Sequence, residues 1–236
     1  GQGYIGQALG WADVLAVAYC HAMSLRPAEP EWEGRDRFLL SHGHYAIAHY
    51  AALIEAGIIP ESELDTYGSD DSRLPMSGMA AYTPGMEISG GSLGIGLGIA
   101  VGMCLGLRRK GSDRFVYNLM SDGELGEGPT WEAAMSAGHW KLANLICLVD
   151  INNQQADGQS GKILGFEPLV DKWAAFGWRV QRADGNDIIT FGTGNNTVYG
   201  DAGIDQITGA GGNHLIYGGT EHDDGKHEQR LVRQRI

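Results

Sequence analysis

Cysteine is scarce in this sequence, and the few cysteines are widely separated. Cys20, Cys104 and Cys147 lie in separate apolar stretches. This spacing suits neither a zinc site nor a disulfide framework, because both need cysteines grouped at characteristic intervals. We therefore expect reduced, buried thiols and a cytoplasmic protein.

Basic residues are also few, with 17 lysines and arginines against 29 acidic residues and a net charge of −12. Nucleic acids and anionic membranes bind clustered positive charge, so we expect neither as a partner. No long apolar run is present either: residues 93–107 are apolar but broken by glycines, and too short to span a bilayer. We expect no signal peptide. It begins at Gly1 without a methionine, which predicts a fragment or a processed form.

Glycine, in contrast, is abundant, with 37 residues. This is about twice the usual share of roughly 7%, and such an excess is typical of phosphate-binding loops or of glycine-rich repeats. The composition changes near Asp184. We expect a first domain at 1–184, incomplete at its C-terminal end, a glycine-rich repeat at 185–220, and a polar, disordered tail at 221–236.

Residues 1–184 alternate between helical and strand patterns. Short apolar runs at 38–41, 115–120 and 145–150 are typical of buried parallel strands. Helical patterns cover 10–23, with Leu15, Ala18 and Ala22 on one face, and then 45–56, 91–108 and 128–140. A strand–helix–strand unit therefore spans 115–150, which predicts an α/β fold with a doubly wound, mostly parallel sheet.

Polar residues follow two of these strands at the point where each strand ends. Asp122 and Gly123 come directly after the second strand, and Asn152 follows the third. Ligands bind at the carboxyl ends of parallel strands, and a helix that begins there offers free N–H groups to an anion. Carboxylate and amide oxygens could share one Mg²⁺ with a phosphate group. A Ser-Asp-Gly sequence alone is most often a simple turn, so the interpretation depends on the matching Asn152.

Five motifs resemble those of the transketolase family and follow one another along the chain in the family's order. Asp122-Gly123 followed by Asn152 resembles its thiamine diphosphate fingerprint. The other matching segments are Tyr4-Ile5-Gly6-Gln7-Ala8-Leu9, Ser41-His42-Gly43-His44, Pro84-Gly85-Met86-Glu87 and Gly91-Ser92-Leu93-Gly94. The resemblance covers residues 3–188 and implies a sheet of the thiamine-diphosphate-binding type. It also implies transfer of a two-carbon ketol unit between sugars or sugar phosphates.

The resemblance also implies roles for individual residues. Magnesium would be held by Asp122, the Asn152 side chain and the Gln154 carbonyl, and the diphosphate would lie against Gly123 and Glu124. Gly91, Ser92, Leu93 and Gly94 would lie near the cofactor. His44 would be catalytic, facing the diphosphate and the sugar. Without the resemblance, His44 would simply be a partly buried loop histidine.

Three positions depart from the family pattern. Tyr4 and Ser77 stand where substrate-facing histidines are typical, and Ile95 replaces a common glutamine. These changes leave the identity of the sugar open. The glutamate that activates the cofactor comes from a second domain in this family, so we expect a second subunit or domain as partner, a dimer, and no turnover by this chain alone.

The repeat has a period of nine residues, with glycine at 185, 194, 203 and 212. The units resemble the calcium-binding repeats of RTX proteins, which form a parallel β-roll. Residues eighteen apart would stack, which brings together Asp187 and Asp205 as a Ca²⁺ site and Asn196 with His214 as a degenerate one. A short roll without metal is the alternative. A non-catalytic calcium-binding module fused to a vestigial cofactor domain is the alternative function.

Overall fold

The computed structural model describes residues 4–152 and 154–181, together with the backbone of short strands between residues 188 and 232. The chain divides into two units, Gly1–Leu169 and Val170–Ile236. In the described part of the chain, no helix is long and apolar enough to cross a membrane.

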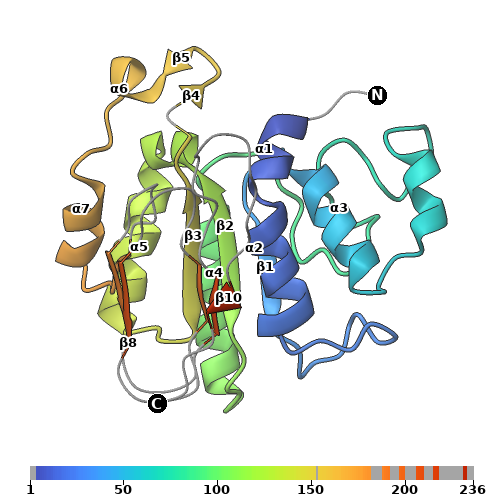
Figure 1. The fold of residues 1–236 in the computed structure, drawn as a ribbon, viewed down its shortest axis with the longest axis horizontal. Helices are drawn as coiled ribbons and strands as arrows, with labels where there is room; N and C mark the ends of the chain where they lie inside the picture. Colours follow the sequence, from blue (N-terminus) through green and yellow to red (C-terminus); the bar gives the residue numbers. More distant parts are fainter. Residues whose placement is uncertain are drawn as a thin grey trace. The chain divides into compact units, whose positions relative to one another are not determined.

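The first unit is built on a three-stranded parallel sheet in the order β1-β2-β3 (Figure 1). Its strands are β1 (Arg37–Leu40), β2 (Val116–Ser121) and β3 (Leu145–Asp150). The register pairs Leu40 with Leu119 and Ser121 with Asp150. All four residues of β1 are buried, as expected for an apolar strand covered on both faces. The predicted α/β fold with a parallel sheet is thereby confirmed.

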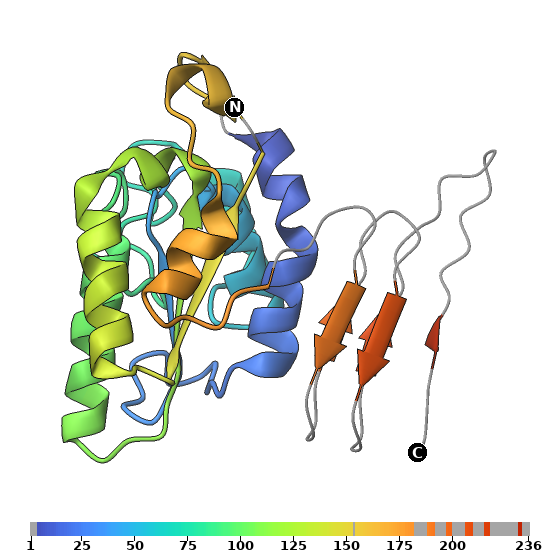
Figure 2. The ribbon, with the colours of Figure 1, turned by 90° about the vertical axis from the view of Figure 1, so that its left-hand side faces the viewer.

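Helices cover both faces of this sheet (Figure 2). One face carries α4 (Gly96–Arg109) and α5 (Gly128–Trp140), which pack against each other. The other face carries α1 (Ile5–Gly10), α2 (Ala12–Val17), the π-helical turn η1 (Ala18–Ala22) and α3 (Ala46–Glu55). The 3-10 helix η2 (Glu61–Thr66) follows α3.

Two of the predicted helices need correction. The predicted helix over 10–23 widens into η1, where the Met23 N–H bonds the Ala18 carbonyl, five residues back. The extra residue in this turn rotates the buried face of the helix. Tyr19 is therefore buried and Ala22 is exposed, contrary to the prediction. The helix predicted from residue 91 begins only at Gly96, because Gly91 and Gly94 have φ angles of +130° and +79°, outside the helical region.

Arg108, in the last turn of α4, binds the end of a neighbouring helix. Its guanidinium donates to the carbonyls of Trp140 and Lys141 at 2.8 Å each. These carbonyls lie at the C-terminal end of α5, where peptide C=O groups have no partner within the helix. Arg108 therefore joins α4 to α5.

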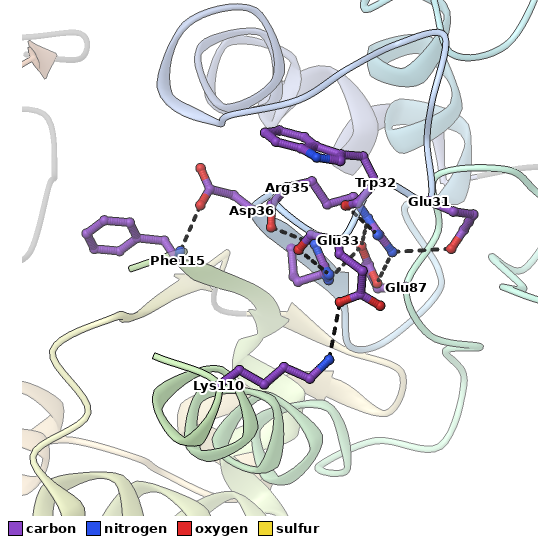
Figure 3. Close-up of polar contacts among 9 residues, drawn as sticks. Glu31, Trp32, Glu33, Arg35, Asp36, Glu87, Lys110 and Phe115 are labelled. Carbon is purple, nitrogen blue, oxygen red and sulfur yellow. Dashed lines mark hydrogen bonds and ion pairs between the residues drawn. The ribbon is translucent and has the colours of Figure 1, made fainter. Parts of the chain in front are cut away.

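A charged cluster fixes the segment before β1 to the Pro84–Glu87 motif (Figure 3). Arg35 donates to both carboxylate oxygens of Glu87, at 2.9 and 3.2 Å, and Arg37 lies 3.6 Å from the same carboxylate. Burial raises the pKa of Glu87, and the hydrogen bond from Arg35 opposes that rise. Asp36 accepts the backbone N–H groups of Ser24 and Phe115 at 2.7 Å each. The cluster lies at the amino end of β1, so Glu87 belongs to the framework rather than to the carboxyl edge of the sheet.

His49 and Tyr19 form a buried polar pair in the apolar core of this unit. The Tyr19 hydroxyl bonds His49 Nε2, and both rings pack against Phe38. Burial lowers the pKa of His49 to about 3. The core pair thus contains a histidine that stays neutral in the folded protein.

This histidine predicts a loss of stability in mild acid. Between about pH 6.5 and pH 3 the unfolded chain protonates His49 and the folded chain does not, so stability falls as pH drops below about 6.5. At pH 5 the expected contribution is about 2 kcal/mol. Urea unfolding at pH 7.5 and pH 5 checks this: His49→Gln should reduce the pH dependence by that amount, while His139→Gln at the exposed end of α5 should leave it unchanged. Equal pH dependence in wild type and His49→Gln contradicts the prediction.

The second unit contains all of α7 (Leu169–Ala175) except its first residue. It also contains the strands β6 (Ile188–Phe191), β7 (Thr197–Tyr199), β8 (Gln206–Gly209), β9 (Leu215–Tyr217) and β10 (Leu231–Val232). β6 pairs with β8 and β7 with β9, both in parallel. Ile189 pairs with Ile207 and Val198 with Ile216, two nine-residue units apart in each case. β10, which pairs antiparallel with β9, lies in the tail for which we predicted no structure. The predicted calcium ligands Asp187 and Asp205, and the pair Asn196 and His214, lie outside the described residues.

Candidate cofactor site

The carboxyl ends of β1, β2 and β3 bring three of the sequence motifs to one edge of the sheet. Ser41 directly follows β1, and its N–H continues the parallel pairing by bonding the Leu119 carbonyl at 2.9 Å. Asp122 directly follows β2, and Asn152 lies two residues after the end of β3. Because Ser121 pairs with Asp150, the Asp122 and Asn152 positions are adjacent at this edge, as predicted.

Glu124 is the central acceptor of this edge. Its carboxylate accepts the Ser41 hydroxyl at 2.5 Å, the Gly94 N–H at 2.9 Å and the Ser121 N–H at 3.1 Å. Burial raises its pKa, while these three hydrogen bonds favour the ionised form and limit the rise. The side chain is fully buried. Glu124, predicted to lie at the diphosphate, thus ties together the segments after β1, before α4 and after β2.

A separate turn lies between β2 and the helix predicted over 128–140. Asp122–Gly126 forms the 3-10 turn η3, with a capping box between Ser121 and Glu124, and α5 begins at Gly128 as predicted. Thr130 in α5 donates to the Glu124 carbonyl at 2.8 Å and so joins the turn to the helix. A Cβ added at Gly123 would meet only the Ser121 hydroxyl, at an ordinary 3.7 Å. The space over Gly123 is therefore left open by its protein neighbours.

The glycine-rich loops pack backbone against backbone. A Cβ at Gly90 would lie 2.6 Å from the Gly43 Cα, and one at Gly43 would lie 2.8 Å from the Ser77 Oγ. Gly43 also has a φ of +71°, which disfavours any side chain. The loop that follows has an exposed Gly91 and Ser92, a half-buried Leu93 and a buried Gly94. Glycine is required here by close loop packing, which also places Ser77 beside the Gly43 loop.

Asp122 and Asn152 differ in their surroundings. Asp122 is 1% exposed and accepts the Ser160 hydroxyl at 2.8 Å. Ser160 begins the short helix α6 (Ser160–Ile163), after the small hairpin β4 (Gln154–Gln155) and β5 (Gly158–Gln159). Asn152 is exposed, and its Oδ1 accepts the Gln154 N–H at 2.9 Å. The three predicted magnesium ligands therefore come from η3, the end of β3 and the start of β4.

Tyr45, which the sequence analysis did not assign to the site, joins the loop after β1 to the loop after β3. Its hydroxyl donates to Asp150 Oδ2 at 2.5 Å, and its side chain is 4% exposed. Burial raises its pKa, as do the hydrogen bond to Asp150 and the negative charges of Asp150 and Asp122. No periodicity signal marks this residue, because its role depends on a partner that lies far away in sequence.

His44 and Tyr4 are in contact at this edge. Their rings meet edge to face with centroids 5.1 Å apart, and His44 is half-buried while Tyr4 is 50% exposed. His42 is buried beside His44, with its Nδ1 accepting the His44 N–H at 3.2 Å, and burial lowers its pKa to about 3. The structure thus brings together the predicted catalytic His44 and Tyr4, one of the residues that depart from the family pattern.

The residues at this edge fit a magnesium diphosphate. A buried carboxylate, an amide oxygen and a backbone carbonyl are the hard oxygen donors that Mg²⁺ prefers, and phosphate oxygens and water complete its octahedron. Open backbone at Gly91 and Gly123 allows a close approach of the diphosphate. Such a set of residues is typical of α/β domains that bind a phosphorylated cofactor at the carboxyl ends of their strands.

The chain belongs to the family described as the transketolase thiamine diphosphate-binding domain, which matches residues 1–194. An uncharacterized transketolase family protein of Sinorhizobium fredii is 77% identical over 188 residues, covering 80% of this chain and 67% of that protein. An apulose-4-phosphate transketolase subunit of Actinobacillus succinogenes is 42% identical over 186 residues, covering 79% of this chain and 67% of its relative. The predicted transketolase-type, thiamine diphosphate-binding domain is thereby confirmed.

Solved transketolase structures share the fold. The enzyme from Leishmania mexicana has a TM-score of 0.70 and 26% identity, covering 88% of this chain and 33% of that one. The enzyme from Campylobacter jejuni has a TM-score of 0.66 and 29% identity, covering 76% of this chain and 28% of that one. The chain thus spans about two thirds of the length of the two relatives above and a third or less of these longer transketolases.

Proposed function

We propose that this chain binds thiamine diphosphate together with Mg²⁺ and forms one half of a transketolase that transfers a two-carbon ketol unit between sugars. The observation that supports this most strongly is the convergence of Asp122, Asn152 and the glycine-rich loops at one edge of the sheet. Two relatives are named as transketolase subunits, one for apulose-4-phosphate and one for 6-deoxy-6-sulfo-D-fructose.

In this proposal the residues of the chain bind and orient the cofactor. Asp122, the Asn152 amide oxygen and the Gln154 carbonyl would hold the Mg²⁺ of a magnesium diphosphate. When bound, thiamine diphosphate supplies the electron sink that ketol transfer requires. Glu124 fixes the loops against which the cofactor lies, since three segments converge on its carboxylate. His44 faces the sugar and can exchange a proton with one of its hydroxyl groups.

A second subunit or domain completes the site. Relatives of similar extent are named as subunits of transketolases, and the longer transketolases extend far beyond the matched region. Apolar side chains exposed on α1, Ile5 at 59% and Leu9 at 71%, and at the start of α4, Ile95 at 49%, are typical of surfaces that a partner covers. The partner would supply the glutamate that activates the cofactor, and the chain would act in the cytoplasm as part of a dimeric assembly.

Tyr4 and Ser77 would help to select the sugar. Tyr4 contacts His44, and Ser77 lies beside the Gly43 loop. A phenol and a hydroxyl can hydrogen-bond a sugar but carry no positive charge, whereas a protonated histidine can attract a phosphate or sulfonate. This favours contact with the uncharged part of the sugar at these two positions.

A calcium-binding role for the nine-residue repeat is the second candidate function. Parallel pairing between strands two units apart is the arrangement expected of an RTX-type β-roll, in which Asp187 and Asp205 would stack. Such a roll would bind Ca²⁺ through carboxylate and carbonyl oxygens. In the alternative function, the calcium-binding module is the active part and the cofactor domain is a vestige.

Calorimetric titration of the full chain separates the two functions. With thiamine diphosphate and Mg²⁺ we expect saturable binding in the micromolar range that disappears in EDTA. With Ca²⁺ alone, binding accompanied by a gain of β-structure in circular dichroism would support the repeat as a calcium module. Calcium binding without any cofactor binding would contradict the transketolase proposal.

A further inference from the structure

The loops after β1 and β3 meet through Tyr45, although β2 separates the two strands in the sheet. The Tyr45 hydroxyl lies 2.5 Å from Asp150 Oδ2, and the Asn152 Nδ2 lies 3.1 Å from the same oxygen and 3.5 Å from the hydroxyl. One carboxylate oxygen therefore accepts two donors. Asp122, which follows the intervening strand, is close enough for its charge to raise the pKa of the Tyr45 hydroxyl.

This network determines how the Asn152 amide is turned. Its NH₂ group faces the Asp150 carboxylate, and its Oδ1 accepts the Gln154 N–H at 2.9 Å. The reverse orientation would set an amide oxygen against a carboxylate and an NH₂ group against an N–H donor, and both contacts are repulsive. An amide oxygen has two lone pairs, so Oδ1 keeps one available while it accepts the Gln154 N–H.

The phenol itself is held by packing. The His42 ring meets the Tyr45 ring edge to face at a centroid distance of 4.1 Å, and both side chains are buried. His42 is fixed in turn by the His44 N–H on its Nδ1. The loop that carries His44 therefore sets the position of the Tyr45 hydroxyl.

We propose that Tyr45 is a positioning residue: its hydroxyl holds the Asp150 carboxylate, and that carboxylate turns the Asn152 amide oxygen toward the metal. This inference rests on the proposed function, because it assigns Asn152 to the magnesium site. Groups that orient metal ligands in this way change metal affinity by about 10–100-fold when they are removed. The loop bearing His44 and the metal-binding loop thus form one unit.

The test measures metal binding by the full chain, with Mn²⁺ as a spectroscopic probe by electron paramagnetic resonance and Mg²⁺ by calorimetry, at saturating thiamine diphosphate. Tyr45→Phe removes only the hydroxyl, and we expect about tenfold weaker metal binding. Tyr19→Phe is the matched control, because it also removes a buried hydroxyl bonded to a side chain, in the core rather than at the carboxyl edge. Its metal affinity should stay within twofold of wild type, even where its melting temperature falls as far as that of Tyr45→Phe.

A double-mutant cycle with Asp150→Asn distinguishes positioning from general destabilisation. If Tyr45 acts through Asp150, the Tyr45→Phe/Asp150→Asn double variant binds metal no more weakly than Asp150→Asn alone. Three results would each overturn the inference and leave the proposed function intact. The losses of metal affinity in the two single variants could add in the double variant, Tyr45→Phe could bind metal within twofold of wild type, or Tyr19→Phe could lose as much metal affinity as Tyr45→Phe. Failure of the wild-type chain to bind metal and cofactor would overturn the proposed function and this inference together.

Discussion

An Asp122→Asn variant is expected to lose at least about a hundredfold in affinity for thiamine diphosphate in the presence of Mg²⁺. The substitution keeps the shape of the side chain and its contact with Ser160 but removes the negative charge at the proposed metal site. Changes in the groups that merely orient metal ligands already cost up to about a hundredfold, and loss of a charged ligand costs at least as much. Calorimetric titration of cofactor at fixed Mg²⁺ measures the effect.

Asp113→Asn provides the control for this variant. Asp113 lies before the amino end of β2, whereas Asp122 follows its carboxyl end, and the Asp113 side chain is 84% exposed. We expect Asp113→Asn to bind cofactor like wild type. Unchanged affinity in Asp122→Asn would remove Asp122 from the metal site.

A Glu124→Ala variant is expected to be destabilised by about 3–5 kcal/mol. The substitution leaves the Ser41 hydroxyl and the N–H groups of Gly94 and Ser121 without their acceptor in a buried setting. Removing one partner of a buried, charge-assisted network has a cost of this size. Urea unfolding at pH 7.5, monitored by far-ultraviolet circular dichroism, gives the change in the free energy of unfolding.

Glu55→Ala, an exposed position in α3, should change the free energy of unfolding by less than about 0.5 kcal/mol. Glu124→Gln retains an oxygen acceptor for part of the network and should fall between wild type and Glu124→Ala. If Glu124→Ala were as stable as Glu55→Ala, Glu124 would not be the residue that joins the three segments. A direct contact between Glu124 and the diphosphate, as predicted from the sequence, would then be the better assignment.

Local sequence signals predicted the elements of the first unit well. The apolar run at 145–150 and the helical pattern at 128–140 coincide with β3 and α5, because burial on a strand or a helix face leaves a short-range pattern. The predicted start of α4 was wrong, because the positive φ angles of Gly91 and Gly94 depend on the loops packed around them. The turn of π-helix at Ala18–Ala22 likewise has no sequence signal in the pattern we used.

The site was predictable in outline but not in its connections. Asp122 and Asn152 could be placed together because parallel strands end at one edge. Tyr45 could not, since its contact with Asp150 spans 105 residues and crosses an intervening strand. Glu124 was assigned to the diphosphate by the resemblance to the transketolase family, whereas its partners come from three segments that only the folded chain brings together.

The most direct test of the proposed cofactor site is a crystal structure of the chain with thiamine diphosphate and Mn²⁺, with the metal located by its anomalous signal. We expect one metal at the carboxyl edge of the sheet, about 2.0–2.3 Å from Asp122, the Asn152 oxygen and the Gln154 carbonyl. The diphosphate should lie on the same metal, over Gly123. A cofactor bound away from this edge, or a metal held without Asp122, would contradict it.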